Sequence, residues 1–397
     1  MNLHTLNILT FRRWLSIVIP LFALLAAGCT NDYYETDYVF EPAEHYDLVD
    51  VHESLQLLWT FTTDERIMNP VIIDDDRVVY IQTQEAVYAV DPQNGSLIWR
   101  HQIKNPLQTF VVPFGDILLI PTEREQVLQG VDSVTGKTIW ELPFYNHVSA
   151  YSGRPRMTDI VVDDQRAYIL LALNRGTAVL AIDPLTGGLL WEAPDDLREG
   201  LSGKIFQDNE EDFLHIRGGG GIWKLDKDDG HILGRIDTPL KSSRQPTYAD
   251  GVAYTSGGPA RAVDLETGET VWSFSPKMCT NSQERTVFEP PILDNDVGYL
   301  LTACEYIAQV ELKSGEPRWL IGIRPTVQSF EPTEDAGYAF TPFGDLLEVD
   351  KTNGEAHIRL SLSPPEIDVT TYDHLTSDED LLILTPGNNQ AFAFRLE

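Results

Sequence analysis

The chain has 397 residues, of which 42% are hydrophobic, so it has ample material for a buried core in one large domain or two ordinary ones. Acidic residues outnumber basic residues by 61 to 29, and the formal net charge is −32. An acidic surface repels phosphate groups, which disfavours nucleic acid and anionic lipid surfaces as partners.

The first 28 residues are predicted to be a signal peptide. Two basic residues, Arg12 and Arg13, precede an apolar segment that runs to about Ala27 and is too short to span a bilayer comfortably. The residues Ala-Ala-Gly then precede Cys29, a pattern that resembles the bacterial lipoprotein signal, in which the cysteine is acylated and becomes the new N-terminus. A plain signal peptide followed by a chance cysteine is the alternative.

Residues 29–54 follow this signal and are expected to form a lipid-anchored tether. The segment TNDYYETDYVFEPAEHYDLVDVHES is acidic and lacks clear hydrophobic periodicity, as a linker does. The folded domain is therefore predicted to occupy residues 55–397.

One phrase recurs along this domain, most clearly as AVDPQNGSLIW, GVDSVTGKTIW, AIDPLTGGLLW and AVDLETGETVW. An acid is followed by glycine four residues later in all seven copies, and usually by tryptophan eight residues later. The acids are Asp91, Asp132, Asp183, Asp226, Asp264, Glu311 and Asp350. The residues eight positions later are Trp99, Trp140, Trp191, Gly234, Trp272, Trp319 and Ile358. Self-similarity at 38 to 51 residues indicates a repeat architecture.

Each copy reads as two strands joined by a tight turn. Residues 85–91 alternate apolar side chains, and residues 96–103 form a second such run. The acid of the turn can bond nearby backbone groups, and its glycine can adopt a positive φ. Two further short strands are expected upstream, at residues 70–74 and 77–83, which makes four antiparallel strands, the content of one propeller blade.

The two ends of the domain predict how many blades there are. Trp59 lies in the run LQLLWTFTT, forty residues before Trp99, and belongs to a strand without a blade of its own. Residues 380–397 supply strands but stop before any tryptophan strand. The remnants complete each other, which predicts an all-β, eight-bladed β-propeller closed by pairing the N-terminal strand with the C-terminal blade.

The repeated tryptophans have two possible roles, packing between blades or stacking against a cofactor. They are Trp59, Trp99, Trp140, Trp191, Trp272 and Trp319. On the outermost strand, a wide ring can wedge against the neighbouring blade's turn and donate its N–H to a carbonyl. A single cofactor cannot need a tryptophan from nearly every blade, so packing is the favoured interpretation.

The phrase A-x-D-x-x-T-G-x-x-x-W resembles the PQQ-like, quinoprotein-type propeller repeat over residues 55–397. With a lipoprotein signal and a short tether, the chain is similar to the BamB family, the propeller lipoproteins of the outer-membrane β-barrel assembly machine. This resemblance implies a non-catalytic, lipid-anchored scaffold that binds a protein partner in the cell envelope. We expect a monomeric propeller at the outer membrane, facing the periplasm. Gly234, Ile358 and Glu311 depart from the repeat.

Two other functions stay open, a PQQ-dependent dehydrogenase and an envelope sensor or ligand-binding propeller. Quinoprotein dehydrogenases usually carry adjacent cysteines, whereas this chain has only Cys29, Cys279 and Cys304. The nine histidines show no metal-binding spacing, and no nucleophile motif is present, so we expect no catalytic residues, no cofactor and no metal.

Three connections on one face of the predicted propeller hold further candidates. Cys279 and Cys304 lie in connections that emerge on that face, and oxidising surroundings would permit a disulfide, with two free thiols as the alternative. The interval between Trp140 and Trp191 carries the longest insertion, at residues 141–157. Candidate partner-binding residues there are Phe144, Tyr145, Tyr151, Arg154 and Arg156, although an ordinary long loop is equally compatible.

We predict that Cys29→Ser releases the protein from membranes, because the acylated thiol would be lost. Membrane fractionation of the variant against the wild type measures the effect. Mass spectrometry of the mature N-terminus supplies the check, since a first residue other than lipidated Cys29 contradicts the prediction.

Overall fold

A computed structural model of the chain describes residues 35–38, 55–67, 69–74, 78–103, 111–122, 127–144, 155–173, 176–193, 204–207, 212–218, 221–237, 246–256, 258–275, 287, 290–303, 305–323, 327, 329–342, 344–362 and 373–396. The chain divides into two units, Met1–Glu35 and Thr36–Glu397. In the described residues, no helix has the length and apolarity needed to cross a membrane.

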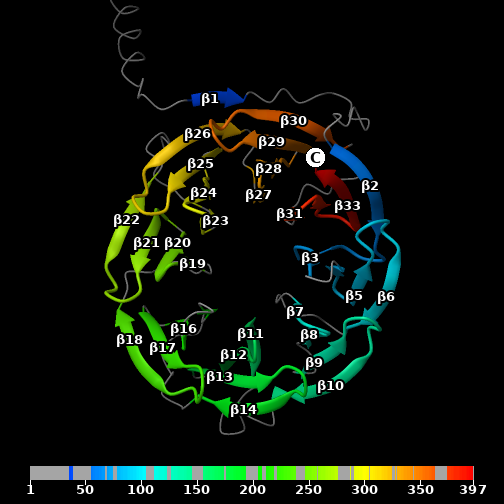
Figure 1. Cartoon of the computed structure of the whole chain (residues 1–397), viewed down its shortest axis with the longest axis vertical. Coiled ribbons are helices and arrows are strands. Elements are labelled where there is room, and N and C mark those ends of the chain that lie inside the picture. Colours follow the sequence, from blue (N-terminus) through cyan, green and yellow to red (C-terminus); the bar gives the residue numbers. More distant parts are fainter. Residues whose placement is uncertain are drawn as a thin grey trace, which may run out of the picture. The chain divides into compact units, whose positions relative to one another are not determined.

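Eight antiparallel sheets surround a common axis in the second unit, which confirms the predicted eight-bladed propeller (Figure 1). Blade 1 consists of β3 (Ile72–Ile73), β4 (Val79–Gln82), β5 (Ala86–Val90) and β6 (Leu97–Gln102). Blade 2 consists of β7 (Val112–Phe114), β8 (Ile117–Thr122), β9 (Val127–Asp132) and β10 (Thr138–Pro143). Blade 3 consists of β11 (Arg156–Val162), β12 (Ala167–Leu173), β13 (Gly176–Asp183) and β14 (Gly188–Glu192). Blade 4 consists of β15 (Lys204–Gln207), β16 (Phe213–Gly218), β17 (Gly221–Asp226) and β18 (Ile232–Asp237).

The remaining blades follow in chain order, with the first strand of each nearest the axis and the fourth outermost (Figure 1). Blade 5 consists of β19 (Thr247–Ala249), β20 (Val252–Thr255), β21 (Ala260–Asp264) and β22 (Thr270–Phe274). Blade 6 consists of β23 (Ile292–Asp294), β24 (Val297–Leu301), β25 (Tyr306–Glu311) and β26 (Pro317–Ile323), with β1 (Glu35–Tyr38) beside β26 as a fifth strand. Blade 7 consists of β27 (Ser329–Pro332), β28 (Ala336–Phe340), β29 (Asp345–Asp350) and β30 (Ala356–Ser361).

Blade 8 closes the ring with strands from distant parts of the chain. It consists of β31 (Asp373–Asp378), β32 (Leu381–Pro386), β33 (Gln390–Leu396) and β2 (Leu55–Thr62). The strand β2 pairs antiparallel with β33, from Leu55 opposite Leu396 to Thr62 opposite Gln390. Beyond this ladder, the Thr63 N–H donates to the Asn389 carbonyl at 2.8 Å. The predicted pairing of the N-terminal strand with the last blade is confirmed.

The core lies between the blades. Both faces of each sheet are covered by neighbouring blades, so the middle strands are largely apolar, such as β8 and β32, in which every residue is buried. Leu346 and Phe340 of blade 7, for example, share one cluster with Leu382 and Phe394 of blade 8. The propeller is therefore stabilised at its seams.

Near the axis, polar side chains satisfy backbone groups of the next blade's innermost strand. A carboxylate oxygen of Asp159 accepts from the Ile205 N–H at 2.9 Å. Glu331 accepts from both the N–H and the hydroxyl of Ser377, at 3.0 and 2.7 Å. These bonds hold strand edges that have no further strand to pair with.

On the outside, each repeat turn is built by its acid and its glycine. In blade 1, the Gly95 N–H donates to the Asp91 carbonyl at 2.9 Å, and the Asp91 carboxylate accepts from the Gln93 N–H at 2.8 Å. The seven turn glycines all have φ between +67° and +79°, a region that L side chains avoid.

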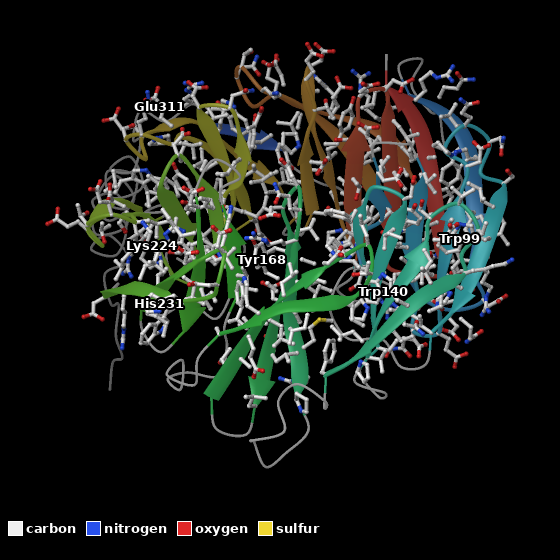
Figure 2. The ribbon with its side chains drawn as sticks, turned by 60° about the horizontal axis from the view of Figure 1, so that its bottom comes forward. Trp99, Trp140, Tyr168, Lys224, His231 and Glu311 are labelled. Carbon is white, nitrogen blue, oxygen red and sulfur yellow. The ribbon has the colours of Figure 1, made fainter. Side chains whose placement is uncertain are left out.

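The tryptophan of the preceding blade covers each of six turns. A Cβ on Gly95 would lie 2.7 Å from the Trp59 ring, and the Trp59 indole N–H donates to the carbonyl of Pro92 at 2.7 Å. The other five bonds run from Trp99 to Ser133, Trp140 to Pro184, Trp191 to Lys227, Trp272 to Leu312 and Trp319 to Lys351, at 2.6 to 3.1 Å. Figure 2 labels Trp99 and Trp140 in this arrangement.

Tryptophan is absent from two repeat positions, and the structural reason differs between them. At the seam of blades 4 and 5, Gly234 stands in the tryptophan position, and the side chain of Ile236 and the carbonyl of Asp237 approach Gly268 instead. In blade 7, Ile358 pairs with Leu347, whose side chain packs in the core shared with blade 6. The next blade, blade 8, has third and fourth strands that are not joined by a turn. An indole at position 358 would have no turn to cover.

A β-bulge precedes the tryptophan position on the outer strands. In blade 1, Ala89 opposes Trp99 and Val90 opposes Leu97, so Ile98 has no partner on β5. The same extra residue occurs in other outer strands at Ile139, Leu190, Leu233, Val271, Arg318 and Leu58. In blade 7 the bulge falls two positions later, at Arg359, after the tryptophan position. Because a bulge re-aims the side chains around it, the tryptophan faces the next blade. The bulged residues Ile98, Ile139, Leu190, Leu233 and Val271 are exposed, whereas Leu58 packs against the core.

We predict that Trp272→Ala lowers the free energy of unfolding by about 3–5 kcal/mol, because it leaves a cavity over Gly315 and an unused carbonyl at Leu312. Ile358→Ala is the matched control at the same repeat position, and its cost is expected to be about 1 kcal/mol or less. Denaturant unfolding measures both. Equal losses would mean that the indole's contact with the turn is not what stabilises the seam.

Candidate functional site

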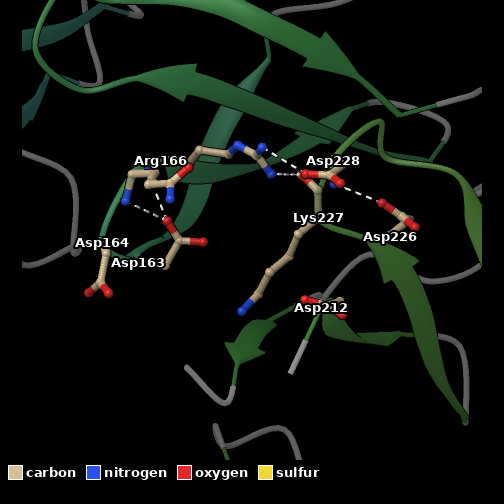
Figure 3. Close-up of a pocket in the computed structure, with 8 residues that line it drawn as sticks. Asp163, Asp164, Arg166, Asp212, Asp226, Lys227 and Asp228 are labelled. Carbon is tan, nitrogen blue, oxygen red and sulfur yellow. Dashed lines mark hydrogen bonds and ion pairs between the residues drawn. The ribbon is translucent and has the colours of Figure 1, made fainter. Parts of the chain in front are cut away.

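A cavity of about 410 Å³ lies where turns of blades 3 and 4 meet (Figure 3). One side is the turn between β11 and β12, residues 163–166. The other side is the repeat turn after β17, at residues 226–228, together with Asp212, which directly precedes β16. The lining is almost entirely charged, with five aspartates around one arginine and one lysine.

Arg166 bridges the two blades at this cavity. Its guanidinium pairs with the Asp228 carboxylate at 2.8 Å and donates a second bond to the Lys227 carbonyl. The Trp191 indole donates to that same carbonyl, at 2.9 Å. The hydrogen bond that Arg166 donates to the Asp228 carboxylate raises the pKa of Arg166 above its ordinary value, so the guanidinium stays charged. The arginine therefore reinforces the turn that the tryptophan covers.

Asp163 shapes the opposite rim. One carboxylate oxygen accepts from the backbone N–H groups of Gln165 and Arg166, at 2.9 and 2.8 Å. The other accepts from the Tyr168 hydroxyl at 2.7 Å. Burial is the largest cause of a raised pKa at Tyr168, followed by its bond to Asp163, so this phenol is a hydrogen-bond donor and not a base.

Lys227 and the acidic residues set the charge of the cavity. The Lys227 N–H donates to the Asp212 carbonyl at 3.0 Å, and the side chain extends into the space between the two rims (Figure 3). Asp164, Asp212 and Asp228 are exposed. Five carboxylates against two cations leave the rim negative, which favours a basic group as its ligand.

The predicted site residues fall into three groups. Cys29, Cys279, Cys304, Tyr145, Tyr151 and Arg154 lie outside the described residues. Arg156 is exposed at the first position of β11. Phe144 corrects one expectation, because its side chain is only 1% exposed and packs with Leu142 and Met157 in the core between blades 2 and 3. It cannot serve as a surface anchor while this core is intact.

Sequence reasoning did not identify the tyrosines that accompany the tryptophans. A tyrosine of the second strand packs against the tryptophan of the same blade, with ring centroids 5.9 to 6.0 Å apart. The pairs are Tyr80 with Trp99, Tyr168 with Trp191, Tyr254 with Trp272 and Tyr299 with Trp319. Their spacing from the repeat acid varies from 10 to 15 residues, so a fixed-register comparison misses them.

The cavity itself was also not predicted. Its rims come from Asp163–Arg166 and from Lys227, which are about 60 residues apart, and each rim alone reads as a solvated turn. One signal was present, since the residue after the repeat acid is lysine in blades 4 and 7, at Lys227 and Lys351. Lys351 also bonds across a seam, to Asp294 at 2.8 Å.

The part of the chain that the structure describes contains no group of three or more His, Cys, Asp or Glu side chains placed to hold a metal ion.

The four-stranded blades, the acid–glycine turns and the indoles that cover them define a PQQ-like β-propeller. A family profile described as outer membrane protein assembly factor BamB matches residues 46–200, 175–331 and 218–375. The chain belongs to this family.

Individual relatives are distant. A polyvinylalcohol dehydrogenase from Sphingopyxis sp. (strain 113P3) is 23% identical over 270 residues, which cover 59% of this chain and only 37% of the relative's length. BamB from Moraxella catarrhalis has a TM-score of 0.59 at 14% identity and covers 86% of this chain and all of that chain. Quinohemoprotein alcohol dehydrogenase from Comamonas testosteroni has a TM-score of 0.62 at 11% identity and covers 86% of this chain and 76% of that chain. These structures share the fold.

We predict that Arg166→Ala destabilises the protein by about 1–2 kcal/mol more than Asp228→Ala does. The Asp228 carboxylate is largely exposed, so its ion pair contributes about 0–1 kcal/mol. Arg166 also bonds the partly buried Lys227 carbonyl, which the alanine variant leaves with one donor fewer. Thermal unfolding of both variants tests the difference. Identical losses would reduce the role of Arg166 to the exposed ion pair.

Proposed function

We propose that this protein is a non-catalytic scaffold that binds a protein partner in the cell envelope, in a role like that of BamB in outer-membrane protein assembly. Membership of the family described as BamB supports this proposal. A lipid anchor at Cys29 would hold the propeller at the membrane while the blades carry the binding surface.

The charged cavity between blades 3 and 4 carries the proposal. Asp163, Asp226 and Arg166 are engaged in bonds that build the turns and join the blades. The cavity is thus a preformed feature with a negative rim, not a set of groups converging on a reacting atom. A rigid negative rim suits a lysine or arginine side chain presented by a partner, because little ordering is required on this side.

A quinone-dependent dehydrogenase is the second candidate. The polyvinylalcohol dehydrogenase relative favours it, although the chain spans about two fifths of that protein. The described residues offer no matched set for calcium, and we derive no step through a quinone. Adding PQQ and calcium to the purified protein and scanning its absorbance separates the candidates, because stoichiometric quinone uptake would contradict the scaffold.

We predict that Asp164→Lys reduces the recovery of bound partner at least tenfold when the protein is captured from its own membranes. Asp164 is an exposed rim residue, and a lysine there repels a basic ligand group. Glu355→Lys makes the same charge change at an exposed position of blade 7 and is expected to leave recovery unchanged. Quantitative mass spectrometry of the captured proteins is the measurement.

A second capture arm replaces Tyr145, Tyr151, Arg154 and Arg156 with alanine. Loss of partner there with full recovery for Asp164→Lys would move the binding site to the 141–157 loop. Undiminished recovery for both variants would contradict a site at either place.

A further inference from the structure

The exposed apolar side chains are concentrated in one sector of the ring. Of the eleven large hydrophobic residues that are exposed in the described part of the chain, seven belong to blades 1–3. We call these seven the apolar wall: Leu97, Ile98, Val134, Ile139, Leu185, Leu189 and Leu190. They lie on β6, β10 and β14, which are neighbours on the outside of the ring, and in the repeat turns of blades 2 and 3 (Figure 1).

The fold does not require these residues to be apolar. Ile98, Ile139 and Leu190 are bulged residues, which the backbone directs outward whatever their chemistry. At the same bulge of blade 6 stands Arg318, whose guanidinium pairs with Asp296 at 2.7 Å. A polar residue is thus compatible with the geometry. A cluster of exposed aliphatic groups in one sector is typical of an interaction surface.

We propose that the apolar wall is a docking surface for a protein segment that combines apolar side chains with lysine or arginine. This inference rests on the proposed function and names the surface and the chemistry of the partner. It places the contact on the outside of blades 1–3, beside the charged cavity at the seam of blades 3 and 4.

Charge complementarity selects this occupant. Glu141 and Glu192 are exposed two residues after the bulged Ile139 and Leu190, so acids flank the wall on β10 and β14. On β6 the equivalent residue is Arg100, which pairs with Asp64 at 3.8 Å. The net charge of −32 opposes an anionic lipid surface and a second copy of the chain. A partner with basic residues beside its apolar ones satisfies both features.

We assign the docking to the aliphatic side chains that the bulges of blades 1–3 direct outward, which supply the contact area. A bulge alone does not prevent strand addition, because β26 carries one at Arg318 and still has β1 beside it.

Site-specific photocrosslinking in the protein's own membranes tests the proposal. A photoreactive amino acid replaces Val134, which is 70% exposed, or Leu185 in the full chain. Leu190→Glu is then added, with Val271→Glu as the matched control, because both side chains are 50% exposed on outer-strand bulges. We expect adducts to partner peptides that contain apolar and basic residues. Leu190→Glu should lower their yield at least tenfold, and Val271→Glu should leave it unchanged.

Several results would overturn the proposal. The first is an adduct yield that Leu190→Glu does not lower, or that Val271→Glu lowers equally. The second is an adduct to lipid or to a second copy of the chain. The third is a crosslinked partner peptide that contains no basic residues. A photoreactive residue at Asp164 separates this failure from that of the proposed function. Adducts at position 164 but not at 134 or 185 would remove the wall and leave the scaffold, whereas no adduct at any of them would contradict both.

Discussion

The contact between an indole and the turn of the next blade is the interaction on which the ring depends. A turn closed by an acid and a glycine with positive φ presents a flat backbone surface and one carbonyl that faces outward. The indole of the preceding blade fills that surface and bonds that carbonyl, as Trp59 does at Gly95 and Pro92. Dispersion and a hydrogen bond act at one place, so each contact fixes both the distance and the angle between neighbouring blades.

The rest of the molecule follows from what this contact demands. The bulge before the tryptophan is needed to aim the ring sideways, and it leaves the preceding residue facing out. The inner strands have no indole–turn contact, and they are held instead by hydrogen bonds to side chains such as those of Asp159 and Glu331. Burial raises the pKa of Glu331, while its bonds from Ser377 lower it. The seams thus combine a wide apolar contact outside with polar bonds near the axis.

Much of the fold could be predicted because the turn chemistry is local. Asp91, Gly95 and Trp99 lie within nine residues, so every copy records the same geometry at a fixed spacing. The closure by Trp59 was readable for the same reason. The cavity was not, because Asp163–Arg166 and Lys227 become neighbours only when two blades meet. Phe144 was misjudged since a residue after the last strand of a blade can turn back into the seam or out to solvent, and its aromatic type suits either.

Blade 7 shows that the indoles are matched to turns and not to blades. Blade 7 has Ile358 in the tryptophan position and precedes the blade whose two outer strands are joined by pairing alone, between β2 and β33. Consider a circularly permuted chain in which a new acid–glycine turn joins residues 396 and 55 and the backbone is opened at another repeat turn. The new turn would have no indole to cover it. The indole that covered the opened turn would lose its contact. The lack of a tryptophan at position 358 therefore coincides with the closure of this propeller, whereas the lack at Gly234 does not. An engineer who moves the closure must move a tryptophan with it.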